Sequence, residues 1–186
     1  EPADRYREKG TGAQLARHLL DRFDLQHVAV EIAPAGDHYD PEARAVRLME
    51  DRYHGHSLTA ITVAAHEVGH AIQDARSERL FRHRQNLAKL AVRGQQFGSL
   101  ILLAAPVVML ITRAPGVGVA FIAVAILSML MGTLVHLVTL PVELDASFGK
   151  ALPILEHGNY LHDGDLPHAN RILKAAALTY VAASLA

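Results

Sequence analysis

Cysteine is absent from this chain of 186 residues. No disulfide can form, and the redox environment of the protein cannot be inferred from thiol usage. The absence also excludes thiolate ligands, so a bound metal ion would need His, Asp or Glu side chains. Histidine, by contrast, occurs 12 times, which is a high number for this length.

An excess of charge of either sign is also lacking. The chain has 18 Lys and Arg residues against 19 Asp and Glu residues. Proteins that bind nucleic acids usually carry a basic excess, so we expect no nucleic-acid partner. The length is sufficient for a single domain with its own core.

Charged residues are missing from two long stretches, residues 94–112 and residues 114–142. A helix needs about 20 apolar residues to cross the hydrocarbon core of a bilayer. The alternative is a pair of core helices in a soluble protein, but two such runs are hard to bury in so small a domain. The sequence therefore predicts a transmembrane helical hairpin at about 94–142, with the lipid bilayer as a partner.

The rest of the chain is expected to be mainly helical, with a small β element. The spacing of apolar residues predicts a helix at 11–23, and alternation predicts short strands at 28–33 and 45–49, with a turn at 36–41. Ser57 is expected to cap the next helix. Basic residues gather just before the first apolar run, which places this side of the hairpin in the cytoplasm by the positive-inside rule.

The run His66-Glu67-Val68-Gly69-His70 indicates a metal site. On a helix, His66 and His70 lie one turn apart on the same face, so both imidazoles can bind one zinc ion. Glu67 would lie beside the open coordination position, where it can activate the zinc-bound water and protonate the leaving amine. With this composition, roughly 0.04 such motifs are expected by chance. We therefore expect one Zn²⁺ per chain.

A catalytic zinc ion needs a third protein ligand, and Glu143 is the best candidate. It ends the second uncharged run, where a carboxylate is costly unless it is paired or bound to a metal. Alternatively, it faces water at the membrane boundary. A hairpin of two crossings would return Glu143 to the side of His66 and His70.

Four stretches in the same order make the chain similar to the YugP-like neutral zinc metallopeptidases of the bacterial membrane. They are HYDP (38–41), AAHEVGHAIQ (64–73), LPVELDAS (140–147) and KAAALTYVAA (174–183). The resemblance implies a single domain over residues 1–186, whose zincin-like part comprises 11–93 and 143–186. It further implies a multi-pass protein of the bacterial inner membrane, and members of the family usually have an additional N-terminal membrane helix. The positive-inside rule places the site near the cytoplasmic face.

The resemblance also implies a gluzincin-type site, in which a Glu on a later helix, here Glu143, is the third ligand. Other gluzincins often have an Asp four residues after that Glu, where this chain has Ser147. Asp145 is therefore a candidate for orienting a ligand histidine. Tyr180 is a candidate oxyanion donor, although packing at a helix interface is the simpler interpretation.

Two further features have competing interpretations. His136 lies seven residues before Glu143, so it could lie near the zinc, stabilise an oxyanion or, as we favour, hydrogen-bond another helix. The strand containing Val46, Arg47 and Leu48 is predicted to be an edge strand that pairs with an extended substrate.

The function expected from these features is that of a zinc-dependent membrane endopeptidase acting on peptides or membrane-associated proteins. The alternative is an inactive zinc-binding membrane protein with a structural or regulatory role. The presence of Glu67 favours the enzyme.

Overall fold

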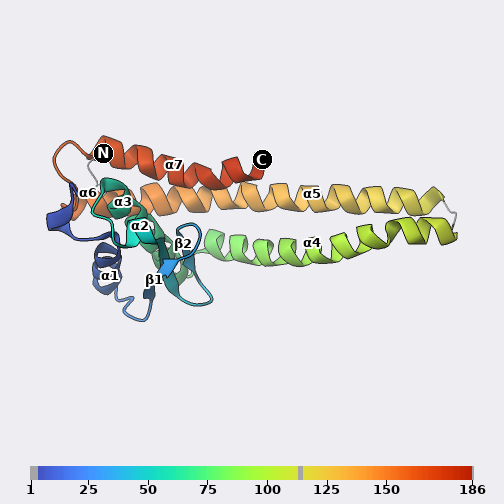
Figure 1. Ribbon diagram of the computed structural model, residues 1–186, viewed down its shortest axis with the longest axis horizontal. Helices are drawn as coiled ribbons and strands as arrows, with labels where there is room; N and C mark the ends of the chain where they lie inside the picture. Colours follow the sequence, from blue (N-terminus) through green and yellow to red (C-terminus); the bar gives the residue numbers. More distant parts are fainter. Residues whose placement is uncertain (1–3, 113–114, 186) are drawn as a thin grey trace.

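The computed structural model describes residues 4–112 and 115–185, without the side chains of a few residues within its helices. A small domain of helices and one sheet lies at one end, and a long helical hairpin projects from it (Figure 1). The architecture is therefore mainly helical with a small β element, as expected.

The sheet has three strands: β1 (Ala29–Ala33), β2 (His38–Asp40) and β3 (Ala45–Met49). Their order is β1-β3-β2, with β1 parallel and β2 antiparallel to β3. The turn expected at 36–41 thus contains a strand. The chain reverses after β2 because the Asp40 carboxylate accepts hydrogen bonds from the backbone N–H groups of Glu42 and Ala43.

The central position of β3 corrects one prediction. Val46, Arg47 and Leu48 do not form an edge strand, because β3 pairs with β1 along its whole length and with β2 as far as Arg47. The Arg47 side chain contacts the two neighbouring strands through ion pairs with Glu31 and Asp40. Backbone groups already used by the sheet are not available to a substrate, so the role proposed for this strand is wrong.

The helical part of the domain is built around α3 (Leu58–Ala75), which is buried from Leu58 to Gln73. Ser57 caps this helix by accepting a hydrogen bond from the Ala60 N–H, as predicted. The other helices before the hairpin are η1 (Arg7–Lys9), α1 (Gly12–Arg22) and α2 (Glu50–Tyr53). Leucines of α1 and the inner residues of β3 pack against α3 to form the core.

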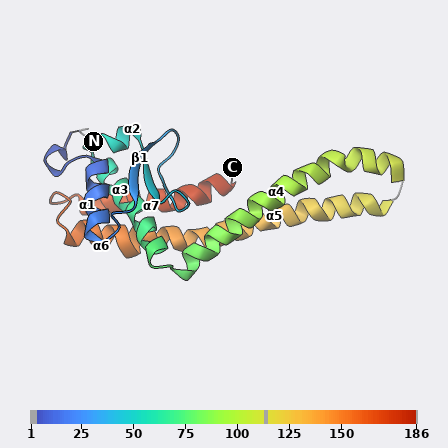
Figure 2. The same cartoon turned by 90° about the horizontal axis from the view of Figure 1, so that it is seen from below.

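The hairpin consists of α4 (Arg79–Thr112) and α5 (Pro115–Leu144), which run antiparallel side by side in both views (Figures 1 and 2). Among the described residues, one helix is long and apolar enough to cross a membrane: Arg79–Ile111. The apolar stretch described in α5 is the shorter segment Gly116–Ser128. Only 6% of the apolar segment of α4 is buried, so nearly all of it lies outside the core of the domain.

After α5 the chain returns to the domain. It continues into the π-helix η2 (Asp145–Ala151), then α6 (Leu152–His157) and α7 (Leu166–Leu185). In Figure 1, α7 runs back along α5 toward the hairpin. Both α7 and η2 pack against α3, as α1 does, so N-terminal and C-terminal parts of the chain meet on this helix.

Candidate metal centre

Three potential ligand atoms converge between α3 and the end of α5. His66 and His70 lie on one face of α3, and Glu143 is the penultimate residue of α5. All three residues are buried, and Glu143 is fully enclosed. The Glu143 Oε2 atom lies 3.3 Å from His66 Nε2 and 3.2 Å from His70 Nε2. Among the described residues, this is the group of His and acidic side chains that could hold a metal ion.

The separations between Glu143 and the two histidines fit a tetrahedral zinc ion. Ligand atoms at about 2.0–2.1 Å from a tetrahedral ion are separated from one another by about 3.3 Å. The two measured separations between nitrogen and oxygen agree with that value. Two imidazoles and one carboxylate are also a common ligand set of catalytic zinc, which keeps a fourth position open.

The hydrogen bond at the Nδ1 atom of each imidazole determines which of the two ring nitrogens carries the proton. The Ser147 hydroxyl donates to the Leu173 carbonyl, so it must accept at 3.0 Å from the Nδ1–H of His66. The Nδ1–H of His70 donates to Gln73 Oε1 at 2.9 Å. Both Nε2 atoms are therefore left as lone-pair donors directed at the third ligand, which is the form that binds a metal.

Gln73 connects the centre to a wider polar network. Its amide group donates to the Val142 carbonyl at 2.9 Å and to Asp145 Oδ2 at 2.7 Å. The Asp145 carboxylate also pairs with Lys150, which in turn pairs with Glu78 at the start of the hairpin. In the part of the chain that the structure describes, Asp145 therefore reaches His70 through Gln73 and not directly.

The two backbones beside the centre approach each other closely at Gly69. A Cβ atom at this position would lie 2.8 Å from the carbonyl oxygen of Ala146. Any larger residue would push α3 away from η2, which begins two residues after Glu143. Gly69 thus allows a ligand pair on one helix to meet a ligand from another.

Arg84 of α4 lies at the other oxygen of Glu143. Its guanidinium is 3.5 Å from Glu143 Oε1, which is buried and has no hydrogen-bond partner. The hairpin therefore contributes two side chains to the centre, one from each arm. This contact had no signal in the sequence, because the basic residues before the first apolar run indicated only the orientation of the hairpin.

Glu67 and the ligand candidate His66 line a cavity of about 590 Å³. Burial raises the pKa of its carboxyl to about 7, against the lowering effect of His66. A group with such a pKa can both accept and donate a proton near neutral pH. The cavity lies mainly between α3 and α7, and its lining residues are Gly36, Asp37, Arg52, Thr59, Val63, His66, Glu67, Ile172, Ala175, Ala176 and Thr179.

Comparison with known proteins agrees with this centre. The model of a family described as "putative neutral zinc metallopeptidase" matches residues 3–186. The chain belongs to this family. A relative, "Putative membrane protease YugP" of Bacillus subtilis (strain 168), is 38% identical over 188 residues, which cover 94% of this chain and 75% of the relative. No solved structure matches the chain.

Membership in the neutral zinc metallopeptidase family confirms the resemblance seen in the four sequence stretches. It also accounts for a buried group of two histidines and one glutamate able to bind a metal. Two other candidates remain predictions. The side chains of His136 and Tyr180 lie outside the described part of the structure.

Gln73 and Arg84 are the residues of this centre that sequence reasoning missed. Gln73 follows His70 by three residues, so its place on the same helix face was a usable signal. Arg84 had no such signal, because its contact with Glu143 depends on how the hairpin packs.

Proposed function

We propose that the protein is a zinc-dependent endopeptidase of the bacterial inner membrane. His66, His70 and Glu143 would hold the zinc ion, and Glu67 would act as the general base. The convergence of three buried donors next to a cavity that contains Glu67 supports this proposal most directly. The substrates would be peptides or membrane-associated proteins.

A zinc ion in this site would polarise the scissile carbonyl and lower the pKa of water. The Glu67 carboxylate would accept a proton from the attacking water and deliver it to the leaving amine nitrogen. The low polarity that raises its pKa also strengthens its interaction with developing charge. Ser147 and Gln73 would hold the two imidazoles in place throughout the reaction.

The cavity between α3 and α7 would hold the substrate chain. Gly36 and Asp37, directly before β2, lie at its border. Because β2 is an edge strand, its outer backbone groups are available to an extended peptide, unlike those of β3. We therefore assign substrate pairing to β2 (His38–Asp40).

We also propose that both arms of the hairpin cross the bilayer, with the metal centre near the cytoplasmic face. Large apolar side chains such as Leu103 and Leu110 are 79% and 76% exposed, and lipid would remove them from water. Basic side chains at the start of α4, including Arg79 and Arg82, would face cytoplasmic headgroups.

Because the chain contains no cysteine, a single introduced cysteine can be labelled specifically, and this labelling tests the topology. Single substitutions Lys9→Cys, in the domain, and Arg113→Cys, between the two arms, can be labelled in intact cells with a maleimide that does not cross the membrane. We expect labelling of Arg113→Cys from outside the inner membrane and of Lys9→Cys only after permeabilisation. Identical labelling of both would contradict a hairpin of two crossings.

Replacement of Glu67 by Gln tests the catalytic role. Removing a general base typically lowers the rate by 10²–10⁴-fold, so cleavage of casein or a fluorogenic peptide by Glu67→Gln should fall by about that factor. Its zinc content should equal that of the wild type, and the exposed control Glu156→Gln should retain full activity. Undiminished cleavage by Glu67→Gln would exclude the mechanism, whereas zinc binding without cleavage by any variant would favour the structural or regulatory alternative.

A further inference from the structure

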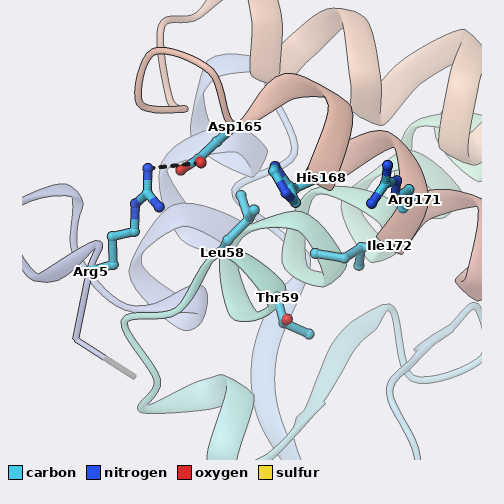
Figure 3. A pocket seen from close by; sticks show the side chains of 7 residues that line it. All are labelled: Arg5, Leu58, Thr59, Asp165, His168, Arg171 and Ile172. Carbon is cyan, nitrogen blue, oxygen red and sulfur yellow. Dashed lines mark ion pairs between the residues drawn. The ribbon is translucent and has the colours of Figure 1, made fainter. Parts of the chain in front are cut away.

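A second cavity, of about 440 Å³, is lined by residues of α3, of α7 and of the segment before η1 (Figure 3). Both cavities are bordered by Thr59 of α3 and Ile172 of α7, so they form two parts of one groove between these helices. We call this second part the distal pocket. Its lining residues His168, Arg171 and Ile172 belong to the first turns of α7, and in Figure 1 this end of α7 lies away from the hairpin.

The distal pocket carries a net positive charge. The opposite charges of Arg5 and Asp165 neutralise each other in an ion pair of 2.8 Å, and the Tyr6 hydroxyl donates a hydrogen bond to the same carboxylate. His168 and Arg171 add basic groups from neighbouring turns of α7, and Figure 3 shows both above the start of α3. Among the described residues, no carboxylate forms an ion pair with Arg171. Its guanidinium is thus available to a ligand.

The distance to the metal centre corresponds to a few residues of substrate. Thr59 and His66 are seven positions apart on α3, which is about 10 Å at 1.5 Å per residue. An extended peptide covers about 3.3 Å per residue, so the distal pocket lies about three residues from the scissile bond. Val63 and Ala175 line the groove between the two ends, and the ion pair of Arg52 with Asp37 also borders it.

We propose that the distal pocket is a substrate subsite that binds a carboxylate, with Arg171 as its principal cation. The carboxylate would belong to an acidic side chain about three residues from the cleaved bond or to the end of the peptide chain. A guanidinium suits this role because it can form two parallel hydrogen bonds with one carboxylate. This inference rests on the proposed peptidase function and adds a preference for acidic substrates.

The test uses the zinc-loaded full chain in detergent and a fluorogenic peptide in which one Glu is moved along positions on both sides of the cleaved bond. The matched peptides carry Gln, and a second pair has a free or an amidated C-terminus. Placing Glu in the distal pocket should lower KM about two- to fivefold relative to Gln, the range of a partly exposed charge pair. The two peptide series distinguish a side-chain carboxylate from a terminal one.

Arg171→Gln should abolish this difference, and Arg171→Lys should restore part of it. Lys174→Gln is the matched control, because it removes the same charge from an exposed position of the same helix that does not line the groove. Its preference for Glu should remain within about twofold of the wild type. Equal KM values for Glu and Gln peptides at every position, with normal cleavage, would overturn the subsite and leave the peptidase function intact.

Binding provides a readout that does not require cleavage. The affinity of the zinc-loaded Glu67→Gln variant for labelled peptides, measured by fluorescence anisotropy, should show the same preference for the acidic peptide. The double variant Glu67→Gln/Arg171→Gln should lose this preference. If the wild type cleaves no peptide, the proposed function fails. The binding measurement then decides the subsite alone, and equal affinity for the acidic and neutral peptides would refute it.

Discussion

Replacing Gln73 by Leu tests whether the hydrogen bonds around the histidines contribute to metal binding. Gln73 is fully buried and contacts no ligand atom of the proposed zinc site, but its Oε1 atom accepts the Nδ1–H of His70. Leucine has a similar volume and cannot accept a hydrogen bond. The substitution therefore leaves the ligand set intact and removes the contact that fixes the His70 ring.

Loss of such a partner typically weakens metal affinity 10–100-fold, which corresponds to about 1.4–2.7 kcal/mol. A second effect is expected on the metal-free protein. The substitution also removes the amide that donates to the Val142 carbonyl and to Asp145. Leaving such buried groups without a donor costs about 1–3 kcal/mol of unfolding free energy.

Competition with a chromophoric chelator measures the zinc affinity of detergent-solubilised protein, and chemical denaturation after chelation measures the second effect. Gln26→Leu is the matched control, since Gln26 is exposed and lies outside the centre. A zinc affinity of Gln73→Leu equal to that of the wild type would refute the orienting role. A changed affinity in the Gln26 control would show that the assay reports something other than the centre.

Two further predictions follow from the same contacts. Glu143→Gln should weaken zinc binding by more than Gln73→Leu, because a neutral amide replaces the anionic third donor; equal affinity to the wild type would exclude Glu143 as a ligand. Tyr6→Phe should lower the unfolding free energy by about 1.5–3 kcal/mol at pH 7, because a hydrogen bond to the Asp165 carboxylate is lost. Burial raises the pKa of Tyr6 to about 12, so its contribution is complete below pH 10 and lost as the pH rises from 10 to 12. The stabilities of wild type and Tyr6→Phe should therefore converge over this interval in denaturation curves, and a constant difference would contradict the assignment.

The features that could be predicted from sequence are those set by local spacing. The pairing of His66 and His70 depends only on the period of one helix, and the cap at Ser57 depends on neighbouring residues. Glu143 was a distant candidate, but its carboxylate at the end of an uncharged run made it conspicuous. The structure brings these residues together, as that reasoning expected.

The features that could not be predicted depend on which elements become neighbours. Alternation in β3 indicates a strand but does not determine whether another strand covers its second edge, and β2 does so. The contact of Arg84 with Glu143 joins two arms of a hairpin. In the sequence, Ser147 was only a departure from the gluzincin pattern, and Asp145 was the candidate for orienting a ligand histidine. In the structure it is the Ser147 hydroxyl that contacts His66.

Because Glu143 lies at the end of α5, a tilt of that helix moves the Glu143 carboxylate. Thirty residues at 1.5 Å each give a length of about 45 Å, with the connection to α4 at one end and the carboxylate at the other. While the helix stays rigid, a swing of about 5° around the far end moves the carboxylate by about 4 Å. That displacement exceeds the 3.2 Å between Glu143 Oε2 and His70 Nε2. Helix tilt and ligand geometry therefore cannot vary independently, and in the proposed orientation a change in bilayer thickness that tilts α5 would move this ligand.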